Sequence, residues 1–245
     1  QENLFGPIPN VSGFYRQLYW VAEQLTVGYY GWRSGALTKI DFQDGYLLRV
    51  DSYQNAATVG LHYLFAQIWP FDQFETLAGR DGFAATYSRL WGEPFATRPM
   101  DVIEGNLTQP PLTLPFRPNE QWALTGGPHP AWGENVPWGA LDFAPPSGES
   151  GCIATQRQST ASASGIVTRS GENTVILDLD GDGYEQTGWV LFYFHLANEG
   201  LAPAGSHLQV GEPVGLPSCE GGRATGTHVH VARRYNGEWL PAEGI

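Results

Sequence analysis

The sequence is poor in positive charge. Its 13 Lys and Arg residues are outnumbered by 25 Asp and Glu residues, so the formal net charge is −12 and the pI is about 4.8. Nucleic-acid binding depends on Lys and Arg contacts to phosphate, and binding to anionic membrane surfaces also needs basic clusters. The composition therefore argues against both kinds of partner.

Cysteine and long apolar runs are also scarce. Cys152 and Cys219 are the two cysteines of a 245-residue chain. Two are too few for a multi-disulfide framework or a thiolate zinc site, but they suffice for one disulfide in an exported protein. Two unrelated reduced thiols are the alternative. No run is apolar enough to insert into a membrane, and no leader sequence opens the chain, so either export is absent or the leader has been removed.

What remains is a globular composition, with 42% hydrophobic and 16% charged residues. Mixed helical and hairpin patterns over residues 1–95 predict a small α+β domain of unknown role. Residues 96–116 are proline-rich and too apolar for a free tether, so we expect a linker lying across a surface. Alternating strand patterns predict a mainly antiparallel β domain over residues 117–245.

The N-terminal elements have recognisable boundaries. Helical spacing begins at Phe14, and Gly28 could end that helix. Asp44-Gly45 predicts a hairpin turn between two alternating segments. A second helix should stop before Pro70. The pair Asp72 and Glu75 resembles a cap that opens a short helix. A last helix should end at Gly92, with its apolar side chains Phe83, Tyr87, Leu90 and Trp91 turned inward.

The β domain carries five of the six histidines, and two of them share one strand. His228 and His230 are separated by one residue, so a strand directs both imidazoles to the same face, roughly 6.6 Å apart. His195 ends the apolar strand "WVLFYFHL", where alternation places it with Leu191 and Tyr193. Alternatively, His228 and His230 lie on a solvent-exposed strand face, and His195 has a purely structural role.

Two further side chains complete the pattern. His129 lies in a Gly- and Pro-rich loop, and Asp142 lies between two apolar residues of a short strand. A carboxylate buried there is costly unless it meets a cation or several donors, although a solvated turn is the alternative. Hydrolytic zinc sites take three His or carboxylate ligands plus water. One loop His, one strand Asp and one His of the H-x-H strand could supply them. We expect His207 at the surface and His62 in a structural role.

The quoted motifs carry a family resemblance. "GGPH", "WGALDF", "LFYFHL" and "SCEGGRATGTHVHVARRYNGEW" occur in the order that resembles the lysostaphin-type and β-lytic zinc metallopeptidases. The likeness covers residues 116–241. It implies an antiparallel sheet with a groove for a substrate peptide, and the zinc ligands His129, Asp142 and His230. It also implies a catalytic pair, His195 and His228.

The resemblance implies one Zn²⁺ and hydrolysis of peptidoglycan cross-bridge peptides, often at Gly-Gly bonds, by an exported bacterial enzyme in the secreted, periplasmic or cell-wall space. It further implies a disulfide between Cys152 and Cys219, because the "CEGG" cysteine is bridged in the secreted branch. Tyr193 and Trp132 are candidate groove-lining residues. One departure is Gly226-Thr227, where the family usually has Gly-Pro.

Other functions remain open. A latent enzyme, with the linker or its Asn106 over the zinc, is one alternative. A non-enzymatic wall-binding or activator protein on the same fold is another, although the ligand set is complete. The N-terminal domain could target the wall, aid folding or cover the site.

An acidic hairpin precedes His195. Asp178, Asp180 and Asp182, followed by Gly183, imitate the first half of a calcium loop. The twelfth position, Trp189, cannot ligate calcium, although Glu185 could replace it in another geometry. A Ca²⁺ site and a solvated hairpin tip are both compatible with this pattern.

Overall fold

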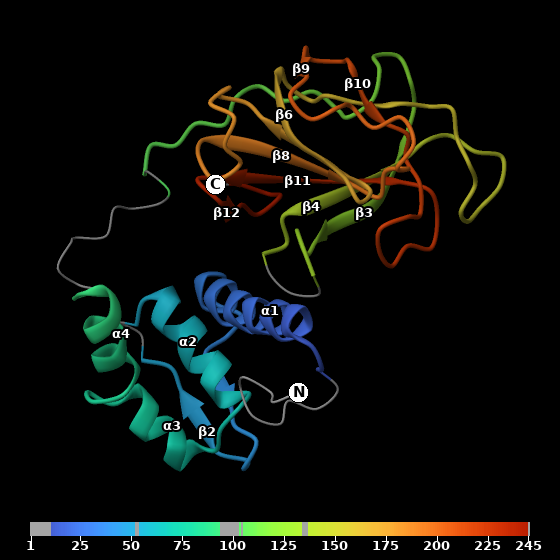
Figure 1. Cartoon of the computed structure of the whole chain (residues 1–245). Coiled ribbons are helices and arrows are strands. Elements are labelled where there is room, and N and C mark those ends of the chain that lie inside the picture. The colour runs from blue at the N-terminus through green and yellow to red at the C-terminus, as the bar shows by residue number, and fades with distance from the viewer. Residues whose placement is uncertain (1–10, 52–53, 94–102, 104, 134–136, 245) are drawn as a thin grey trace. The chain divides into compact units, whose positions relative to one another are not determined.

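The computed structural model describes residues 11–51, 54–93, 103, 105–133 and 137–244 (Figure 1). The chain divides into two compact units, residues 1–100 with 133–136 and residues 101–132 with 137–245. The first unit is helical with one small hairpin, and the second is an antiparallel sheet. The α+β and β fold classes are thus confirmed. The domain boundary expected at residue 95 lies outside the described residues.

The N-terminal unit combines helices with the predicted hairpin. Its elements are α1 (Phe14–Arg33), β1 (Lys39–Asp41), β2 (Leu47–Arg49), α2 (Ala56–Ala66), α3 (Phe71–Ala78) and α4 (Phe83–Trp91). The hairpin turns at Asp44-Gly45, where Gly45 has a φ of 83° that a residue with a Cβ rarely adopts. Buried Ile40, Phe42 and Phe65 form its core with the helices.

The expectation that Gly28 ends the first helix was wrong. Helix α1 continues through Gly28 to Arg33. A Cβ at residue 28 would lie 2.6 Å from Tyr63 Cβ and 2.8 Å from Gly60 Cα, so the glycine allows α1 and α2 to pack closely. The close contact between the two helices, and not the end of a helix, explains the glycine at this position.

Two expectations for the last helices were also wrong. Asp72 and Glu75 do not cap helix α3: Pro70 occupies the N-cap position without a side-chain hydrogen bond, and Asp72 lies in the first turn of the helix. Helix α4 ends at Gly92 as expected, but its apolar side chains are not inward. Phe83, Leu90 and Trp91 are 39%, 58% and 70% exposed. The helical period identified one face of α4 correctly as apolar, but the described residues do not bury that face.

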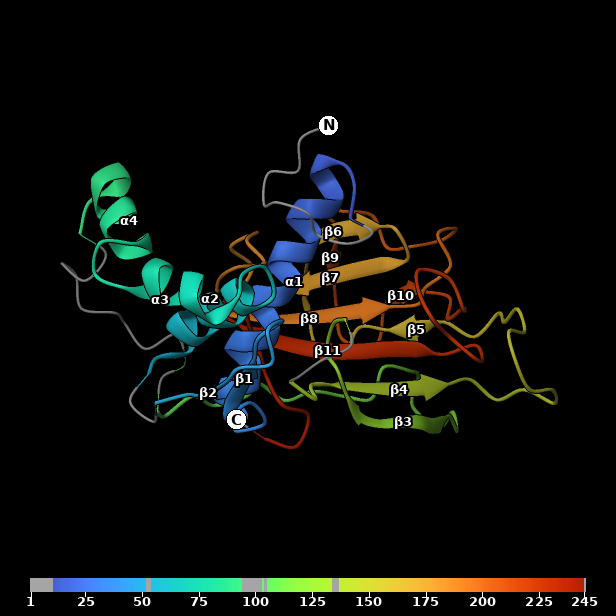
Figure 2. The same cartoon turned by 90° about the horizontal axis from the view of Figure 1, so that it is seen from below.

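The C-terminal unit is built on an antiparallel sheet with the order β3-β4-β11-β8-β7-β6-β9, and β12 pairs with β11 (Figure 2). Its strands are β3 (Ala123–His129), β4 (Ala140–Ala144), β5 (Ser159–Thr160), β6 (Gly165–Gly171), β7 (Thr174–Asp178), β8 (Trp189–Phe194), β9 (His207–Leu208), β10 (Pro213–Gly215), β11 (Val229–Tyr235) and β12 (Glu238–Trp239). Strands β5 and β10 pair separately.

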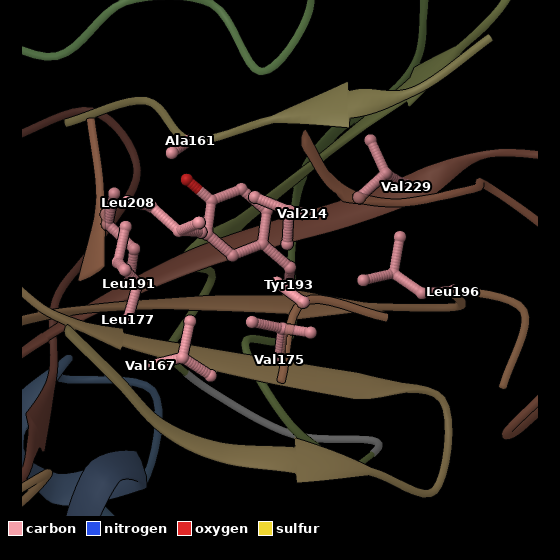
Figure 3. Packing of buried hydrophobic residues seen from close by; sticks show 11 residues of the cluster. Ala161, Val167, Val175, Leu177, Leu191, Tyr193, Leu196, Leu208, Val214 and Val229 are labelled. Carbon is pink, nitrogen blue, oxygen red and sulfur yellow. The ribbon is translucent and has the colours of Figure 1, made fainter. Parts of the chain in front are cut away.

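The two faces of this sheet differ in their contents. One face forms the larger apolar core, centred on Tyr193 with Leu177, Leu191 and Val229 (Figure 3). The Tyr193 side chain is fully buried, and its hydroxyl accepts a hydrogen bond from Ser162 N. Burial raises the pKa of Tyr193 to about 12. Tyr193 is therefore a core residue, and its expected place in the groove was wrong.

The later part of the linker lies on the core face. Thr113 N donates to Ser162 O, and Thr160 N donates to Pro115 O. Residues 112–115 border a cavity of about 310 Å³ with Leu141, Phe143 and Val231. These three side chains alternate with Asp142 and His230, so this part of the linker covers the sheet face opposite to those two residues. Residues 112–115 therefore lie across the surface of the sheet, and the linker as a whole stays a prediction.

Candidate metal centre

Three side chains from neighbouring strands meet on the other face of the sheet. His129 ends β3, Asp142 lies in β4 and His230 lies in β11; Asp142 is the direct cross-strand partner of His230. His129 Nε2 lies 3.0 Å from His230 Nδ1 and 3.2 Å from Asp142 Oδ1, and His230 Nδ1 lies 3.4 Å from Asp142 Oδ1. His129 thus belongs to an edge strand and not to the loop expected from sequence.

Backbone carbonyls fix which nitrogen of each ring carries the proton. His129 Nδ1 lies 2.9 Å from Gly127 O, and His230 Nε2 lies 3.0 Å from Ala131 O. A carbonyl oxygen only accepts hydrogen bonds, so these two nitrogens donate and the opposite nitrogens, in the neutral rings, present lone pairs. Sequence reasoning missed both carbonyls, because backbone acceptors leave no signature in residue types.

The centre is therefore a triangle of three acceptors. Asp142 Oδ1 is buried and has no hydrogen-bond partner. Bare acceptors held this close repel each other unless a cation lies between them. A tetrahedral zinc site with bonds of about 2.0–2.2 Å has ligand–ligand distances of about 3.3–3.6 Å. The three observed distances lie near this range, so His129, Asp142 and His230 fit a metal ion.

The electrostatic environment favours an ionised aspartate. Burial by itself would raise the pKa of Asp142, but the adjacent His129 and His230 more than reverse this effect and hold the pKa well below its usual range. Contact with Asp142 in turn raises the pKa of His129, against the opposing effect of burial. The carboxylate is thus available as an anionic ligand at neutral pH.

Two more imidazoles lie beside this triangle. The ring centroids of His195 and His228 are 4.6 Å apart, and His228 Nε2 lies 3.6 Å from Asp142 Oδ2. Each ring is again oriented through a carbonyl: His228 Nδ1 lies 2.8 Å from Gly226 O, and His195 Nδ1 lies 2.7 Å from Glu220 O. The Nε2 atoms of both rings are therefore left as acceptors in the neutral form.

His195 reaches this group through an unusual backbone conformation. Strand β8 ends at Phe194, which pairs with His230, so regular alternation would send residue 195 to the core face with Tyr193. His195 instead has a φ of 59°. Its ring packs beside Phe194 and lies 6.2 Å from His230, centroid to centroid. The expectation that His195 shares a face with Leu191 and Tyr193 was therefore wrong.

A cleft adjoins the centre. A volume of about 500 Å³ lies between residues 144–155 and residues 225–228, and Asp142 and His228 are among its walls. Trp132 is 45% exposed and packs edge-on against Phe192 and at a tilt against Phe194, next to Ala131, which contacts His230. The structure therefore places Trp132 beside the site.

A disulfide joins Cys152 to Cys219, as the resemblance implied, with Cα atoms 5.7 Å apart. It connects one wall of the cleft to the segment that leads into β11. Thr227 adds two hydrogen bonds across the same gap, from its N to Gly151 O and from its Oγ1 to Ile153 O. A proline at position 227 would lack the first of these donors.

In the acidic hairpin, one carboxylate oxygen from each of Asp178, Asp180 and Asp182 lies within 4.8 Å of the other two. Both carboxylate oxygens of buried Asp178 accept backbone hydrogen bonds, with Oδ2 bound to Gly183 N. Glu185 is not free to complete a calcium site, because its Oε2 binds Arg169 at 2.9 Å and Arg234 at 2.7 Å. The role of Glu185 as a replacement for the twelfth calcium ligand stays a prediction, and in this structure its carboxylate is paired with two arginines.

The other two histidines are not members of this cluster. His207 is exposed in β9, as expected for a surface residue. His62 lies in α2 of the N-terminal unit, where it packs edge-on against Phe74. Burial lowers the pKa of His62, which agrees with a structural role.

Comparison with known proteins covers the whole chain. The family described as "LasA, N-terminal domain" matches residues 2–103, a segment that sequence reasoning had left without a relative. Protease LasA of Pseudomonas aeruginosa strain UCBPP-PA14 is 25% identical over 268 aligned residues, which cover 100% of this chain and 60% of that protein. The strain PAO1 protein is 26% identical over the same shares. The chain thus spans 60% of the length of these relatives.

Among solved structures, the M23 metalloprotease pseudoalterin from the deep sea is 25% identical, with a TM-score of 0.44, and the match covers 54% of this chain and 75% of that one. The whole-chain similarity to Protease LasA and the converging His129, Asp142 and His230 agree with the sequence resemblance. The chain is thus similar over its whole length to Protease LasA, and its C-terminal unit brings together the residues on which the lysostaphin-type resemblance rests.

Proposed function

We propose that the chain is a zinc-dependent endopeptidase that hydrolyses peptide bonds in peptidoglycan cross-bridges. The observation that carries this proposal is the triangle of bare acceptors made by His129, Asp142 and His230, with two more imidazoles beside it. A bound zinc ion would polarise the scissile carbonyl and make water acidic enough to attack it near neutral pH. The three acceptors would hold that ion.

The flanking histidines would supply proton transfer. In their neutral forms, His195 and His228 both present Nε2 as an acceptor, since a backbone carbonyl holds each Nδ1–H. One ring can accept a proton from the attacking water, and the protonated ring can then donate it to the leaving amine. The other ring, when protonated, can stabilise the developing oxyanion. Burial lowers the pKa of His195, which favours a neutral ring ready to accept a proton.

The cleft supports an extended substrate with small side chains. Ser147, Ser150, Thr225 and Thr227 contribute small hydroxylated walls, and Gly226 brings the backbone close. Such walls leave space for a peptide main chain and offer hydrogen bonds to it. We therefore propose Gly-containing bonds as the first substrates to test.

The Cys152–Cys219 bridge supports a location outside the reducing cytosol, in the secreted, periplasmic or wall compartment. None of the described helices is long and apolar enough to cross a membrane. An acidic net charge of −12 offers no general attraction for nucleic acid. The proposed partners are thus peptidoglycan peptides.

The test is cleavage of pentaglycine and of purified wall peptides by the full chain, read by mass spectrometry. We expect fragments that disappear after treatment with a zinc chelator and in the H228A variant. His207→Ala is the matched control, because His207 is exposed and distant in sequence from every member of the cluster. Absence of cleavage by a chain that still binds one zinc ion would favour the latent or non-enzymatic alternative.

The latent alternative depends on what covers the centre. Residues 112–115 of the linker lie on the opposite face of the sheet, so that part of the linker cannot block it. Asn106 is exposed, and its carbonyl accepts a hydrogen bond from Thr108 Oγ1. Neither observation supports the proposal that the linker occupies the site.

A further inference from the structure

His195 adopts its left-handed conformation within a set of local hydrogen bonds. A φ of 59° is unfavourable for a residue with a large side chain, so surrounding contacts must hold it. Its carbonyl oxygen accepts from Ser218 N at 2.7 Å and from Ser218 Oγ at 2.9 Å. Its ring Nδ1 donates to Glu220 O at 2.7 Å. Ser218 and Glu220 thus fix the backbone and the ring of His195.

The Glu220 carbonyl is itself held through the Glu220 side chain. Glu220 Oε2 accepts from Asn173 Nδ2 at 2.7 Å and from Asn198 N at 3.4 Å. Glu220 N donates to Ser218 Oγ at 3.0 Å. The residue that orients the imidazole is therefore tied to the β6–β7 hairpin on one side and to Ser218 on the other.

Asn173 is suited to this task in two ways. It lies in the turn between β6 and β7 with a φ of 64°, a conformation that asparagine tolerates better than most residues. It is only 7% exposed, and its amide Nδ2 donates to both Leu196 O and Glu220 Oε2. Leu196 N returns a hydrogen bond to Asn173 O. Leu196 follows His195 in the chain, and Glu220 binds its ring, so the Asn173 amide holds residues on both sides of His195.

The packing leaves little freedom in this segment. A Cβ at Gly221, which has a φ of 86°, would lie 2.7 Å from Asn173 Cβ and 2.7 Å from Phe194 Cε2. A Cβ at Gly222 would lie 3.4 Å from His195 Cε1. The two glycines after Glu220 therefore let the chain wrap closely around the end of β8.

We propose that Asn173 and Glu220 are positioning residues for the reaction. They hold the Glu220 carbonyl so that His195 carries its proton on Nδ1 and presents Nε2 as an acceptor beside His228. Neither residue touches the metal centre, and both act through His195. This inference rests on the proposed peptidase function, but its effect on the His195 ring can be measured without substrate.

The kinetic test uses variants that remove the side-chain contacts and leave the fold possible. N173G keeps a residue that favours the turn and removes the amide, and E220A removes the carboxylate. We expect kcat to fall about 10- to 100-fold in both, as for other outer contacts of a metal site, with KM and zinc content unchanged. E220Q should retain most of the activity, because its amide oxygen can still accept from Asn173 Nδ2.

The matched control is N236G. Asn236 also has a positive φ, of 48°, in a hairpin turn, and its Oδ1 accepts from Gly188 N. A purely structural role for Asn173 predicts that N173G and N236G lose stability alike while the folded enzyme keeps its kcat. That result would overturn the inference.

The second readout is the nitrogen-15 NMR spectrum of the His195 ring in the full chain. We expect a single tautomer protonated at Nδ1 in the wild type and in E220Q, and a mixture of tautomers in N173G and E220A. Unchanged ring signals in N173G and E220A would overturn the inference even if no substrate is cleaved. Failure to cleave any substrate, with the expected tautomer change, would instead count against the proposed function alone.

Discussion

Gly126 lies directly opposite Asp142 in the β3–β4 pair, and a Cβ at residue 126 would lie 2.5 Å from Asp142 Oδ2. The absent side chain thus makes room for the carboxylate. We predict that G126A displaces Asp142 and lowers zinc affinity about 10- to 100-fold. Competition with a chromophoric chelator measures this affinity. G127A is the matched control, since a Cβ at residue 127 meets nothing within 4 Å, and equal losses in both variants would refute the prediction.

The Cys152–Cys219 bridge should contribute substantially to stability. It spans 67 positions of the chain. In the chain-entropy description, a closed loop of this length stabilises the folded state by about 4 kcal/mol. We expect the C152S/C219S double variant to lose roughly this free energy of unfolding in urea denaturation. Thiol counting on the denatured wild type should detect no free thiol, and two reactive thiols would show that the bridge does not form.

Glu185 should give the protein a pH-dependent stabilisation. Burial alone would raise its pKa, but Arg234 and Arg169 more than offset this and lower it. The stabilisation is therefore present above the unfolded carboxyl pKa, about 4.3, and is lost as the pH falls through the lower folded pKa.

We predict that the free energy of unfolding of E185Q is about 1 kcal/mol lower than that of the wild type at pH 7, since solvent partly screens the charge-assisted hydrogen bonds of the partly exposed Glu185 side chain. Denaturant titrations at several pH values should show this difference shrinking below pH ~4. E199Q, at an exposed position, should behave as the wild type. A difference that does not vary with pH would rule out this origin.

The acidic hairpin should not need calcium for its conformation. Asp178 already accepts hydrogen bonds from the backbone on both oxygens, Asp182 Oδ2 accepts from Thr187 Oγ1 at 2.6 Å, and Glu185 binds two arginines. We predict no heat in a calorimetric calcium titration and no change in melting temperature. Binding that D180N abolishes would instead restore the Asp178–Asp180–Asp182 cluster as a calcium site.

The features that the sequence predicted best are those that short-range patterns determine, such as turns and the direction of side chains along one strand. Asp44-Gly45 specifies a hairpin through its turn geometry, and the spacing of His228 and His230 specifies a shared direction through strand alternation. The grouping of His129 with Asp142 required long-range pairing, which the family resemblance supplied and local patterns could not. The roles of these histidines stay predictions until they are tested by mutation.

The wrong expectations have physical causes. A left-handed backbone at His195 breaks the alternation that otherwise determines which face a side chain occupies. Gly28 serves a close helix–helix contact, and composition cannot distinguish this use from helix termination. The hydrogen bond that Asn173 Nδ2 donates to Glu220 Oε2 connects residues 47 positions apart, and no spacing rule points to it.

The most direct test is zinc reconstitution followed by cleavage in the same samples. The full chain is stripped of metal, zinc is added back in steps, and bound zinc and pentaglycine cleavage are measured together for the wild type and for D142N. The proposed function predicts activity that rises in proportion to bound zinc and saturates at about one ion per chain, with both lost in D142N. Cleavage by the metal-free chain, or tight zinc binding that D142N leaves intact, would contradict it.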